Sequence, residues 1–359
     1  MAVAKEKIAV VLPNHLGDVV MATPALRALR RGRPDAEITG VVRATLLGVL
    51  RGAPFIDRFV AHRIYERRGK LAQLRERLRV ASELRGSDVA LVLPNSFASA
   101  LLAFASRARV SVGYARRARS LLLTDPVPAP RVNGRFVPLA MERYYLDLAR
   151  RLGAPDLGTQ IELFLEPEAE RECDARFAAA GVGGRPLVCL APGAGFGPSK
   201  LWPLEYVAEV ARALRADGAD VALVHGPGEG ALADEIRTRA GVGIAMLGGD
   251  SMSLSLLKSV LARAQLLICN DAGARHIAAA FEVPTIVLMG PTAVGYTNLN
   301  LKRTKLLREP VECSPCQLKV CPIDHRCMTR LLPSRVLAEA RAALSRRDWQ
   351  GSVELELAT

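Results

Sequence analysis

The sequence predicts an α/β protein with two tandem Rossmann-like domains, each built on a doubly wound parallel sheet. Two observations predict this class. Short apolar runs alternate with amphipathic helical stretches, and the alternation occurs in two series, separated by a Glu-rich segment and the turn sequence Gly181-Val-Gly-Gly-Arg-Pro186. The length of 359 residues is also that of about two domains.

The first series opens with a βαβ unit. Strands are expected at Ile8–Leu12 and Ile38–Arg43, joined by an amphipathic helix over Val20–Arg31. The series continues with expected helices at Lys70–Leu84, Phe97–Ala105 and Val137–Leu152 and expected strands at Val89–Leu93 and near Val110.

The second series has the same pattern without any detectable sequence repeat. We expect strands at Leu187–Leu190, Val221–Val224, Leu266–Cys269 and Thr285–Leu288, and helices at Leu204–Ala216, Ala231–Ala240 and Ala272–Phe281. In doubly wound sheets, ligands bind beyond the carboxyl ends of the strands. Functional residues are therefore expected in the loops that follow the strands.

Composition and charge narrow the class of protein. Half of the residues are hydrophobic and 24% are charged, which is typical of a globular protein. No apolar run reaches the ~20 residues of a membrane span, and Met1–Lys7 does not have the pattern of a signal peptide, so we expect a cytoplasmic protein.

The net positive charge is confined to the first half of the chain. Residues 1–165 hold 27 Lys and Arg against 14 Asp and Glu, whereas the remainder is neutral. This basic half would attract nucleic acid, an anionic membrane or a phosphorylated substrate, unless it reflects biased Arg usage.

The loop after the first strand reads Pro13-Asn-His-Leu-Gly-Asp18. Gly17 lets the backbone approach a ligand closely. Asp18 lies where a helix is expected to begin, and its carboxylate can serve either as a general base or as a helix cap.

Two loops of the second half have features of phosphate sites. In Ala191–Pro203, three alternating Gly residues expose backbone amides beside Lys200, although a plain Gly-rich turn is an alternative. In Asn270–His276, Gly273 and the adjoining amides open a helix, whose N-terminus favours anions, and His276 follows one turn later. Thr292 adds a hydroxyl after the next strand.

Four of the seven cysteines are clustered near the C-terminus. Cys313, Cys316, Cys321 and Cys327 have a spacing that is compatible with a zinc or iron thiolate site, and His325 lies among them. Reduced thiols or a partly disulfide-bonded loop are the alternatives. The other three cysteines fall in expected helices or strands and are expected in the core.

Together and in this order, these loops resemble the ADP-heptose:lipopolysaccharide heptosyltransferases of glycosyltransferase family 9, in particular the enzymes that add the second heptose. The resemblance spans nearly the whole chain. It is carried by Gly17-Asp-Val-Val-Met-Ala-Thr-Pro-Ala-Leu26, Leu93-Pro-Asn-Ser-Phe97, Pro192-Gly-Ala-Gly-Phe-Gly-Pro-Ser-Lys-Leu-Trp-Pro203, Asn270-Asp-Ala-Gly-x-x-His-x-Ala-Ala-Ala280, Gly290-Pro-Thr292 and Cys313-Ser-Pro-Cys316.

The resemblance implies a GT-B fold, in which the two domains face each other across a cleft. Residues 1–170 would bind the acceptor and residues 171–332 the nucleotide sugar. Residues 333–359 would form a C-terminal helix, at Pro333–Arg347, and a tail that packs back on the N-terminal domain.

The resemblance also implies a mechanism and partners. Asp18 would take the proton from an acceptor hydroxyl, which attacks the anomeric carbon of ADP-heptose with inversion, and no cofactor would be required for catalysis. The acceptor would be the anionic lipopolysaccharide inner core, a heptose or Kdo sugar, at the cytoplasmic face of the inner membrane. The implied donor-binding residues are Ser199, Lys200, Asp271, Ala272, Gly273, His276 and Thr292, and the implied acceptor-binding residues are Asn14, His15, Asn95, Arg116, Arg117 and Arg119.

One departure from the family and three alternatives bear on this interpretation. The family commonly has Ser or Thr where this chain has Ala272, which puts the identity of the donor sugar nucleotide in question.

The main alternative is a family 9 enzyme with another donor or acceptor, or a UDP-sugar transferase or epimerase of the same fold. With 5% aromatic residues and no basic-aromatic motif, we expect no nucleic-acid partner. A nicotinamide-dependent dehydrogenase is disfavoured because Asn14–Asp18 contains a single Gly.

Overall fold

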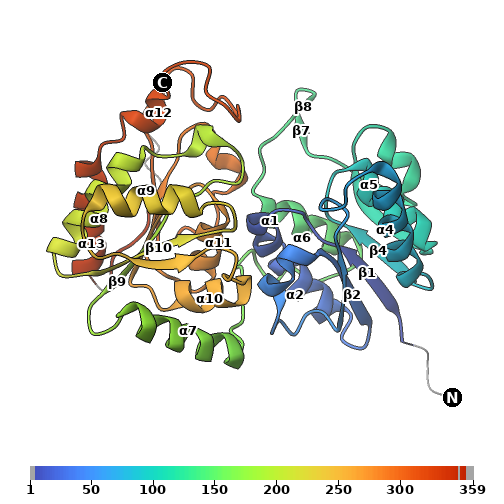
Figure 1. Ribbon diagram of the computed structural model, residues 1–359. Coiled ribbons are helices and arrows are strands. Elements are labelled where there is room, and N and C mark those ends of the chain that lie inside the picture. The colour runs from blue at the N-terminus through green and yellow to red at the C-terminus, as the bar shows by residue number, and fades with distance from the viewer. Residues whose placement is uncertain (1–4, 347, 353–359) are drawn as a thin grey trace. The chain divides into compact units, whose positions relative to one another are not determined.

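The computed structural model describes residues 5–346 and 348–352, without the side chains of residues 117, 132 and 135. The chain forms two compact units (Figure 1). The first comprises Met1–Phe164 and Gly295–Leu299, and the second comprises Leu165–Val294 and Asn300–Thr359. The main division thus falls after Phe164, a few residues before the expected boundary at residue 170.

The sheet of the first unit has six strands, all parallel. In spatial order they are β3 (Arg58–His62), β2 (Glu37–Arg43), β1 (Lys7–Val11), β4 (Val89–Val92), β5 (Val110–Ala115) and β6 (Asp125–Pro128). The order reverses direction between β1 and β4, which is where a doubly wound sheet opens a ligand crevice. Strands β7 (Arg131–Val132) and β8 (Arg135–Phe136) form a separate antiparallel pair.

The second unit repeats the same topology. Its parallel strands run in the order β11 (Ala245–Gly248), β10 (Asp220–His225), β9 (Leu187–Ala191), β12 (Leu266–Asn270), β13 (Thr285–Leu288) and β14 (Thr304–Leu307). The reversal lies between β9 and β12. The loops that follow these two strands are therefore brought to one place at the edge of the sheet.

Helices cover both faces of the first sheet, with α2 packed on α6 and α4 packed on α5 (Figure 1). The helices are α1 (Leu16–Met21), α2 (Thr23–Gly32), α3 (Leu47–Leu50), α4 (Lys70–Glu83), α5 (Phe97–Ser106) and α6 (Met141–Arg151). The helix expected at Val20–Arg31 is divided between α1 and α2. The break follows from Pro24, which lacks an amide hydrogen and starts a new first turn.

The second unit contains seven α-helices within its described residues. They are α7 (Pro167–Ala180), α8 (Leu204–Ala216), α9 (Gly230–Ala240), α10 (Leu254–Ala262), α11 (Gly273–Ala280), α12 (Arg326–Thr329) and α13 (Pro333–Ser345). Four short 3-10 helices complete the elements: η1 (Ala44–Leu46), η2 (Arg117–Leu122), η3 (Pro198–Lys200) and η4 (Val294–Tyr296).

Helix α13 lies in the second unit, and residues 347 and 353–359 of the expected C-terminal helix and tail lie outside the described residues. The helix packs on α8 and buries Val336, Leu337 and Ala340 in the core of the second unit. Its apolar stripe fits the face of the second sheet that α8 also covers.

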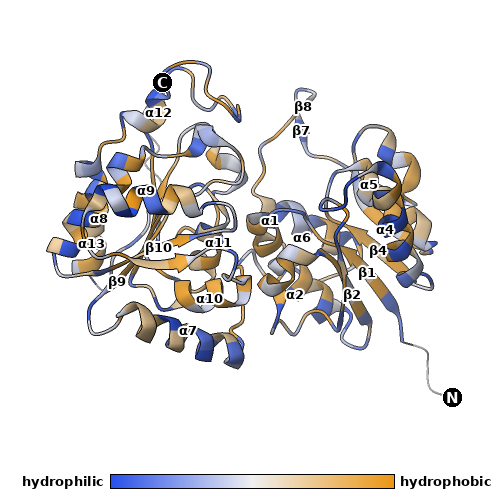
Figure 2. Cartoon of the chain, in the orientation of Figure 1, coloured by the Kyte–Doolittle hydropathy of each residue, from blue (hydrophilic) through white to orange (hydrophobic). Residues whose placement is uncertain are grey.

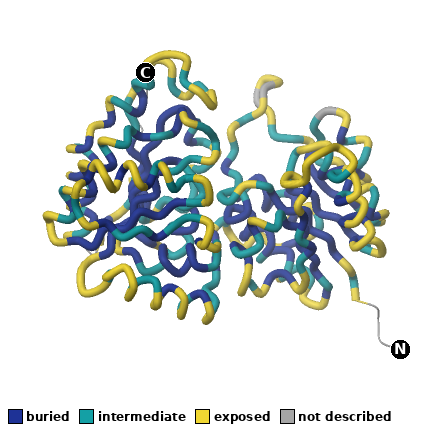
Figure 3. Tube along the Cα trace, in the orientation of Figure 1, coloured by how far each residue is buried: buried dark blue, intermediate teal, exposed yellow. Residues whose placement is uncertain are grey.

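The core of each unit lies at its sheet. Strands β4, β9, β10, β12 and β13 are buried along their entire length, as parallel strands covered on both faces should be (Figures 2 and 3). Cys173, Cys189 and Cys269 are buried free thiols, which confirms their predicted place in the core. Among the described residues, no helix combines the length and apolarity needed to cross a bilayer.

Candidate functional site

A buried polar cluster lies beyond the carboxyl ends of β9, β12 and β13. The Lys200 ammonium donates to Asp271 Oδ2 at 2.5 Å and to the Asp271 carbonyl oxygen at 2.9 Å. Thr292 Oγ1 donates to Asp271 Oδ2 at 2.7 Å, and Arg275 donates to Asp271 Oδ1 at 2.8 Å. Three predicted donor-binding residues are thus brought together, and Asp271 is the acceptor that connects them.

The cluster carries an excess of positive charge. Lys200 and Arg275 are both buried and cationic, whereas Asp271 supplies one negative charge. Despite its burial, the pKa of Asp271 is lowered, because Arg275, Lys200 and Thr292 stabilise its charged form. The pKa of His276 is lowered to about 3 by burial and by the Arg275 charge, so His276 is neutral at physiological pH. Two cations and one carboxylate form an environment that favours an added anion.

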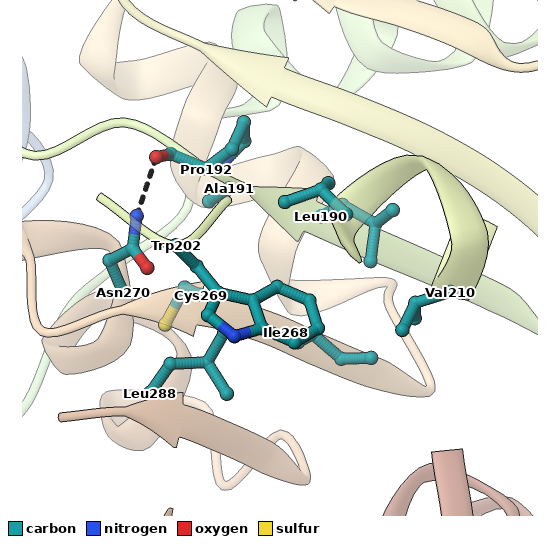
Figure 4. A pocket seen from close by; sticks show the side chains of 10 residues that line it. Leu190, Ala191, Pro192, Trp202, Val210, Ile268, Cys269, Asn270 and Leu288 are labelled. Atoms are coloured by element: carbon teal, nitrogen blue, oxygen red, sulfur yellow. Dashed lines mark hydrogen bonds between the residues drawn. The ribbon is translucent and has the colours of Figure 1, made fainter. Parts of the chain in front are cut away.

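The two loops of this cluster are held together beneath it (Figure 4). Asn270 Nδ2 donates to the Pro192 carbonyl oxygen at 2.5 Å. The pocket under these loops is lined almost entirely by apolar side chains, including Trp202, Ile268 and Leu288. This pocket therefore has little capacity to hydrogen bond a ligand.

Helix α11 begins at the cluster. Its N-cap is Ala272, which makes no side-chain hydrogen bond to the first turn. A Ser or Thr at this position would cap the helix through its hydroxyl. The amides of Gly273 and its neighbours therefore lack a side-chain cap, and a bound anion can use them.

Ser199 is engaged elsewhere. Its Oγ donates to the Leu318 carbonyl oxygen at 2.6 Å, its amide donates to Lys319 at 3.1 Å, and the side chain is buried. His325 Nε2 is 2.6 Å from the Ser199 carbonyl oxygen. These contacts favour a role for Ser199 in holding the loop that carries Lys200.

The segment 313–329, which we call the cysteine strap, contacts both loops of the cluster. Besides Ser199, it binds the loop after β13, where Ser314 Oγ donates to Gly290 at 2.7 Å and the Gln317 amide donates to Pro291 at 2.8 Å. Gly197 has φ +154°, and a side chain there would collide with Lys319, so the strap lies directly on the loop. The strap therefore braces the loops that carry Lys200 and Thr292.

The four clustered cysteines all lie within the described residues, and the thiolate metal site remains a prediction. Cys313, Cys316, Cys321 and Cys327 are free thiols, and within the described residues, which include all four, no group of three or more His, Cys, Asp or Glu side chains is arranged to hold a metal ion. Burial, and then the charges of the neighbouring Cys313, Cys321 and Cys316, raise the pKa of Cys327 to about 11.

In the first unit, Asp18 lies in the first turn of α1 beyond β1. It does not cap the helix, because the N-cap residue is His15 and no side chain caps this end. His15 Nδ1 lies 3.5 Å from Asp18 Oδ2. Burial and then the charge of Asp18 raise the pKa of Tyr145 well above its ordinary value, so this phenol stays protonated beside the carboxylate. Asp18 is partly exposed, and its carboxylate is accessible for proton transfer.

The predicted acceptor residues differ in exposure: His15 is exposed, Asn14, Asn95 and Arg116 are partly buried, and Arg119 is buried. Asn14 donates to the Tyr65 hydroxyl at 3.2 Å, while Asn95 Oδ1 accepts from Tyr144 at 3.1 Å and from Arg119 at 3.3 Å. Arg119 is buried and donates to the Pro94 carbonyl oxygen at 2.6 Å. Its extended side chain reaches inward across Gly113 because glycine leaves the space open.

Arg119 retains unused hydrogen-bonding capacity. Its Nε and Nη2 have no partner in the described structure, and burial lowers its pKa. Arg116 stacks over the Phe136 ring at 3.8 Å, and its Nε is also without a partner. A buried guanidinium whose donors have no protein partner can bind an anionic ligand. The side chain of Arg117 lies outside the described residues.

Sequence reasoning missed three candidate residues. His62 and Arg77 line a pocket with Asn14 beyond the carboxyl ends of β1 and β3, and each has a buried nitrogen without a partner among the described residues. Glu229 accepts the Gly226 amide hydrogen at 2.8 Å and lies against Gly193. The sequence did contain a signal for Glu229, because Glu229 follows β10 in Gly226-Pro-Gly-Glu229. An acidic side chain beside a phosphate-binding loop is suited to bind ribose hydroxyls.

Comparisons with known proteins identify the family of the chain. The family model of glycosyltransferase family 9 (heptosyltransferase) matches residues 77–326. Lipopolysaccharide heptosyltransferase 2 of Salmonella typhimurium is 29% identical over 356 residues, which cover 94% of this chain and 99% of that protein.

Two solved structures share the fold. Escherichia coli ADP-heptose lipopolysaccharide heptosyltransferase II has a TM-score of 0.76 at 24% identity, over 96% of this chain and 100% of that chain. The family 9 glycosyl transferase of Veillonella parvula has a TM-score of 0.82 at 21% identity, over 96% and 99%. These likenesses confirm the predicted GT-B class. Because the family model covers well over half of its residues, the chain belongs to glycosyltransferase family 9, the heptosyltransferase family.

Proposed function

We propose that this protein transfers heptose from ADP-heptose to a heptose or Kdo sugar of the lipopolysaccharide inner core. The observation that carries the proposal is the buried cluster of Lys200, Asp271, Arg275 and Thr292 at the switch point of the second sheet. Its net positive charge suits a diphosphate. Relatives that match over most of their length are named lipopolysaccharide heptosyltransferase 2, which supports the sugar and the acceptor.

The diphosphate of the donor is expected to bind between Lys200 and the amides at the start of α11. As the bond between the anomeric carbon and the phosphate oxygen breaks, that oxygen gains negative charge, and Lys200 and Arg275 stabilise it electrostatically. Gly273 supplies the backbone amide that approaches the phosphates. Neutral His276 donates or accepts a single hydrogen bond there, according to its tautomer.

Asp18 is proposed as the general base. It takes the proton from the acceptor hydroxyl as that oxygen attacks the anomeric carbon, and ADP leaves from the opposite face with the bonding electron pair. The result is inversion at the anomeric carbon. His15 and protonated Tyr145 lie beside Asp18 and orient its carboxylate.

The acceptor is proposed to bind the first unit through its negative groups. Arg119 and Arg116 have donors without partners in the described structure, and Asn95 is held in place by Arg119 and Tyr144. Sugar acids and phosphates of the inner core offer the carboxylate and phosphate oxygens that guanidinium groups bind well. We place the reaction at the cytoplasmic face of the inner membrane, where such an acceptor would be anchored.

The charge stabilisation just described requires no metal cofactor, since Lys200 and Arg275 act on the leaving diphosphate. The experiment that tests the proposal is a transfer assay with ADP-heptose, UDP-glucose and ADP-glucose as donors and a truncated inner-core acceptor. Heptose transfer from ADP-heptose alone supports the proposal. Transfer of another sugar, or from a UDP donor, would replace it with a different family 9 activity.

A further inference from the structure

Two neighbouring helices of the first unit expose large apolar side chains to solvent. On α4 these are Leu71, Leu74 and Leu78, and on α5 they are Phe97, Leu101 and Phe104. Leu71 is 61% exposed and Phe104 is 59% exposed. The spacings of three and four residues place each set on one side of its helix, and the two helices pack against each other. We call these six side chains the apolar face.

Helix α5 is unusual for a surface helix. Its ten residues, Phe-Ala-Ser-Ala-Leu-Leu-Ala-Phe-Ala-Ser, include no charged side chain. One side packs in the core through Ala100, Leu102 and Ala103, yet the opposite side is apolar as well. A surface helix normally presents polar residues to water, so an apolar outer side indicates a binding surface. Figure 2 shows the hydrophobic colouring of α5, and Figure 3 shows α4 and α5 at the periphery of their unit.

The surroundings of the apolar face are basic. Residues 63–85, which include all of α4, contain eight Lys and Arg against three Glu. Lys70 and Arg75 are exposed, and Arg107 and Arg109 follow α5 directly. Apolar side chains bordered by Lys and Arg are the pattern of a helix that lies in the interface of an anionic bilayer. A second copy of the chain fits this face less well, because pairing would bring two net positive surfaces together.

The apolar face is continuous with the proposed acceptor site. Phe97 lies two residues after Asn95, at the start of the helix that follows β4. Leu121, which is 85% exposed, lies two residues after Arg119 on η2, and η2 packs on α5. The segments that carry the acceptor-binding candidates therefore lead directly into exposed apolar residues.

We propose that the apolar face docks the first unit on an anionic lipid bilayer and so presents the acceptor site to lipid-anchored sugars. The consequence for the acceptor rests on the proposed function, whereas lipid binding itself does not. The face inserts its Leu and Phe side chains among the acyl chains, and the flanking Lys and Arg side chains bind the lipid phosphates.

The test is cosedimentation of the full chain with vesicles of phosphatidylcholine, with and without phosphatidylglycerol. We expect binding to the anionic vesicles, weakened by high salt. The triple variant Phe97→Ser/Leu101→Ser/Phe104→Ser should lose at least about 100-fold in affinity for these vesicles. The matched control is Val320→Ser/Ile323→Ser, which removes exposed apolar side chains from the second unit and should bind as the unchanged protein does.

Two further variants test the same surface and show whether the protein remains folded. Phe104→Trp should show a blue-shifted emission with anionic vesicles, since the two natural tryptophans, Trp202 and Trp349, are buried in the second unit. Lys70→Glu/Arg75→Glu should weaken vesicle binding while leaving the thermal unfolding temperature unchanged. Failure of the unchanged protein to bind anionic vesicles, or equal binding by the triple variant, overturns the proposal. The proposal is also overturned if the unchanged protein is a dimer and the triple substitution makes it monomeric without changing lipid binding. None of these readouts uses a sugar donor, so a failure of the proposed function is seen separately in the transfer assay.

Discussion

Lys200 donates to Asp271 through both the carboxylate, at 2.5 Å, and the backbone carbonyl, at 2.9 Å, although 71 positions separate them in the chain. The contact joins the loop after β9 to the loop after β12 at the reversal of the sheet. The ammonium that holds the two loops together therefore lies at the place where we propose that the diphosphate binds.

Lys200→Ala should weaken ADP binding about 10- to 100-fold, because it removes a charge-assisted hydrogen bond worth about 1.5–3 kcal/mol. It also leaves Asp271 with one cation fewer, which should lower the unfolding temperature. Isothermal titration calorimetry with ADP measures the first effect. Lys302→Ala, which removes an exposed ion pair with Glu282 in the same unit, is the control and should bind ADP normally. Unchanged ADP affinity in Lys200→Ala would remove Lys200 from the donor site.

Asp18→Asn should lower kcat about 100- to 10,000-fold, the usual contribution of a general base. ADP affinity should stay the same, because Asp18 belongs to the first unit and the nucleotide is expected on the second. The comparison variant Asp35→Asn alters an exposed carboxylate elsewhere in the first unit and should retain full turnover. Full turnover in Asp18→Asn would assign the proton transfer to another group.

Arg119→Gln should raise the KM for the acceptor and leave ADP affinity unchanged. The variant removes a buried cation that has free donors, so an anionic acceptor loses its partner. Arg58→Gln, at an exposed position of the same unit, should have no effect on the KM. A lower kcat at an unchanged acceptor KM would instead show that Arg119 acts only by holding the Asn95 loop.

The free energy of unfolding should fall as pH is lowered from 7.5 to 5.5. His276 has a folded pKa of about 3, and the pKa of His62 is also lowered by burial. Below the ordinary pKa of 6.5, the unfolded chain binds protons at these residues that the folded chain does not, so acid favours unfolding. Each such His contributes a slope of up to about 1.4 kcal/mol per pH unit. Urea unfolding of His276→Gln should show a shallower dependence in this range, and an unchanged slope would contradict a neutral, buried His276.

His325→Asn should weaken ADP binding about fivefold, because its contact with the Ser199 carbonyl braces the loop of Lys200. Asn is chosen because His325 has a positive φ of 58°, which Asn tolerates. Val320→Ser, at an exposed position of the same strap, is the control and should bind ADP normally. Equal affinity in His325→Asn would show that the strap does not support the donor site.

The inner strands of both sheets could be predicted from the sequence, and the outer strands could not. Strands β1, β2, β4 and β5, and their counterparts β9, β10, β12 and β13, are rich in apolar residues because both of their faces are covered. The edge strands β3, β6, β11 and β14 were all missed. Asp125-Pro-Val-Pro128, for instance, contains two prolines. An edge strand tolerates proline, but a segment with two prolines is not predicted as a strand from its sequence.

The buried polar cluster of Lys200, Asp271 and Thr292 was predictable for a related reason. Its residues follow inner strands in order, so topology alone brings Lys200, Asp271 and Thr292 to one edge. The directions of single side chains were not predictable. Ser199 turns toward the cysteine strap, and Arg119 turns inward over Gly113, because of neighbours that are distant in sequence.

The most direct test is mass spectrometry of a truncated inner-core acceptor after incubation with the protein and ADP-heptose, with Asp18→Asn in parallel. We predict that the unchanged protein adds one heptose and releases ADP, and that the variant binds ADP but adds none. An acceptor that gains no sugar from ADP-heptose while gaining one from another nucleotide sugar would contradict the proposed function.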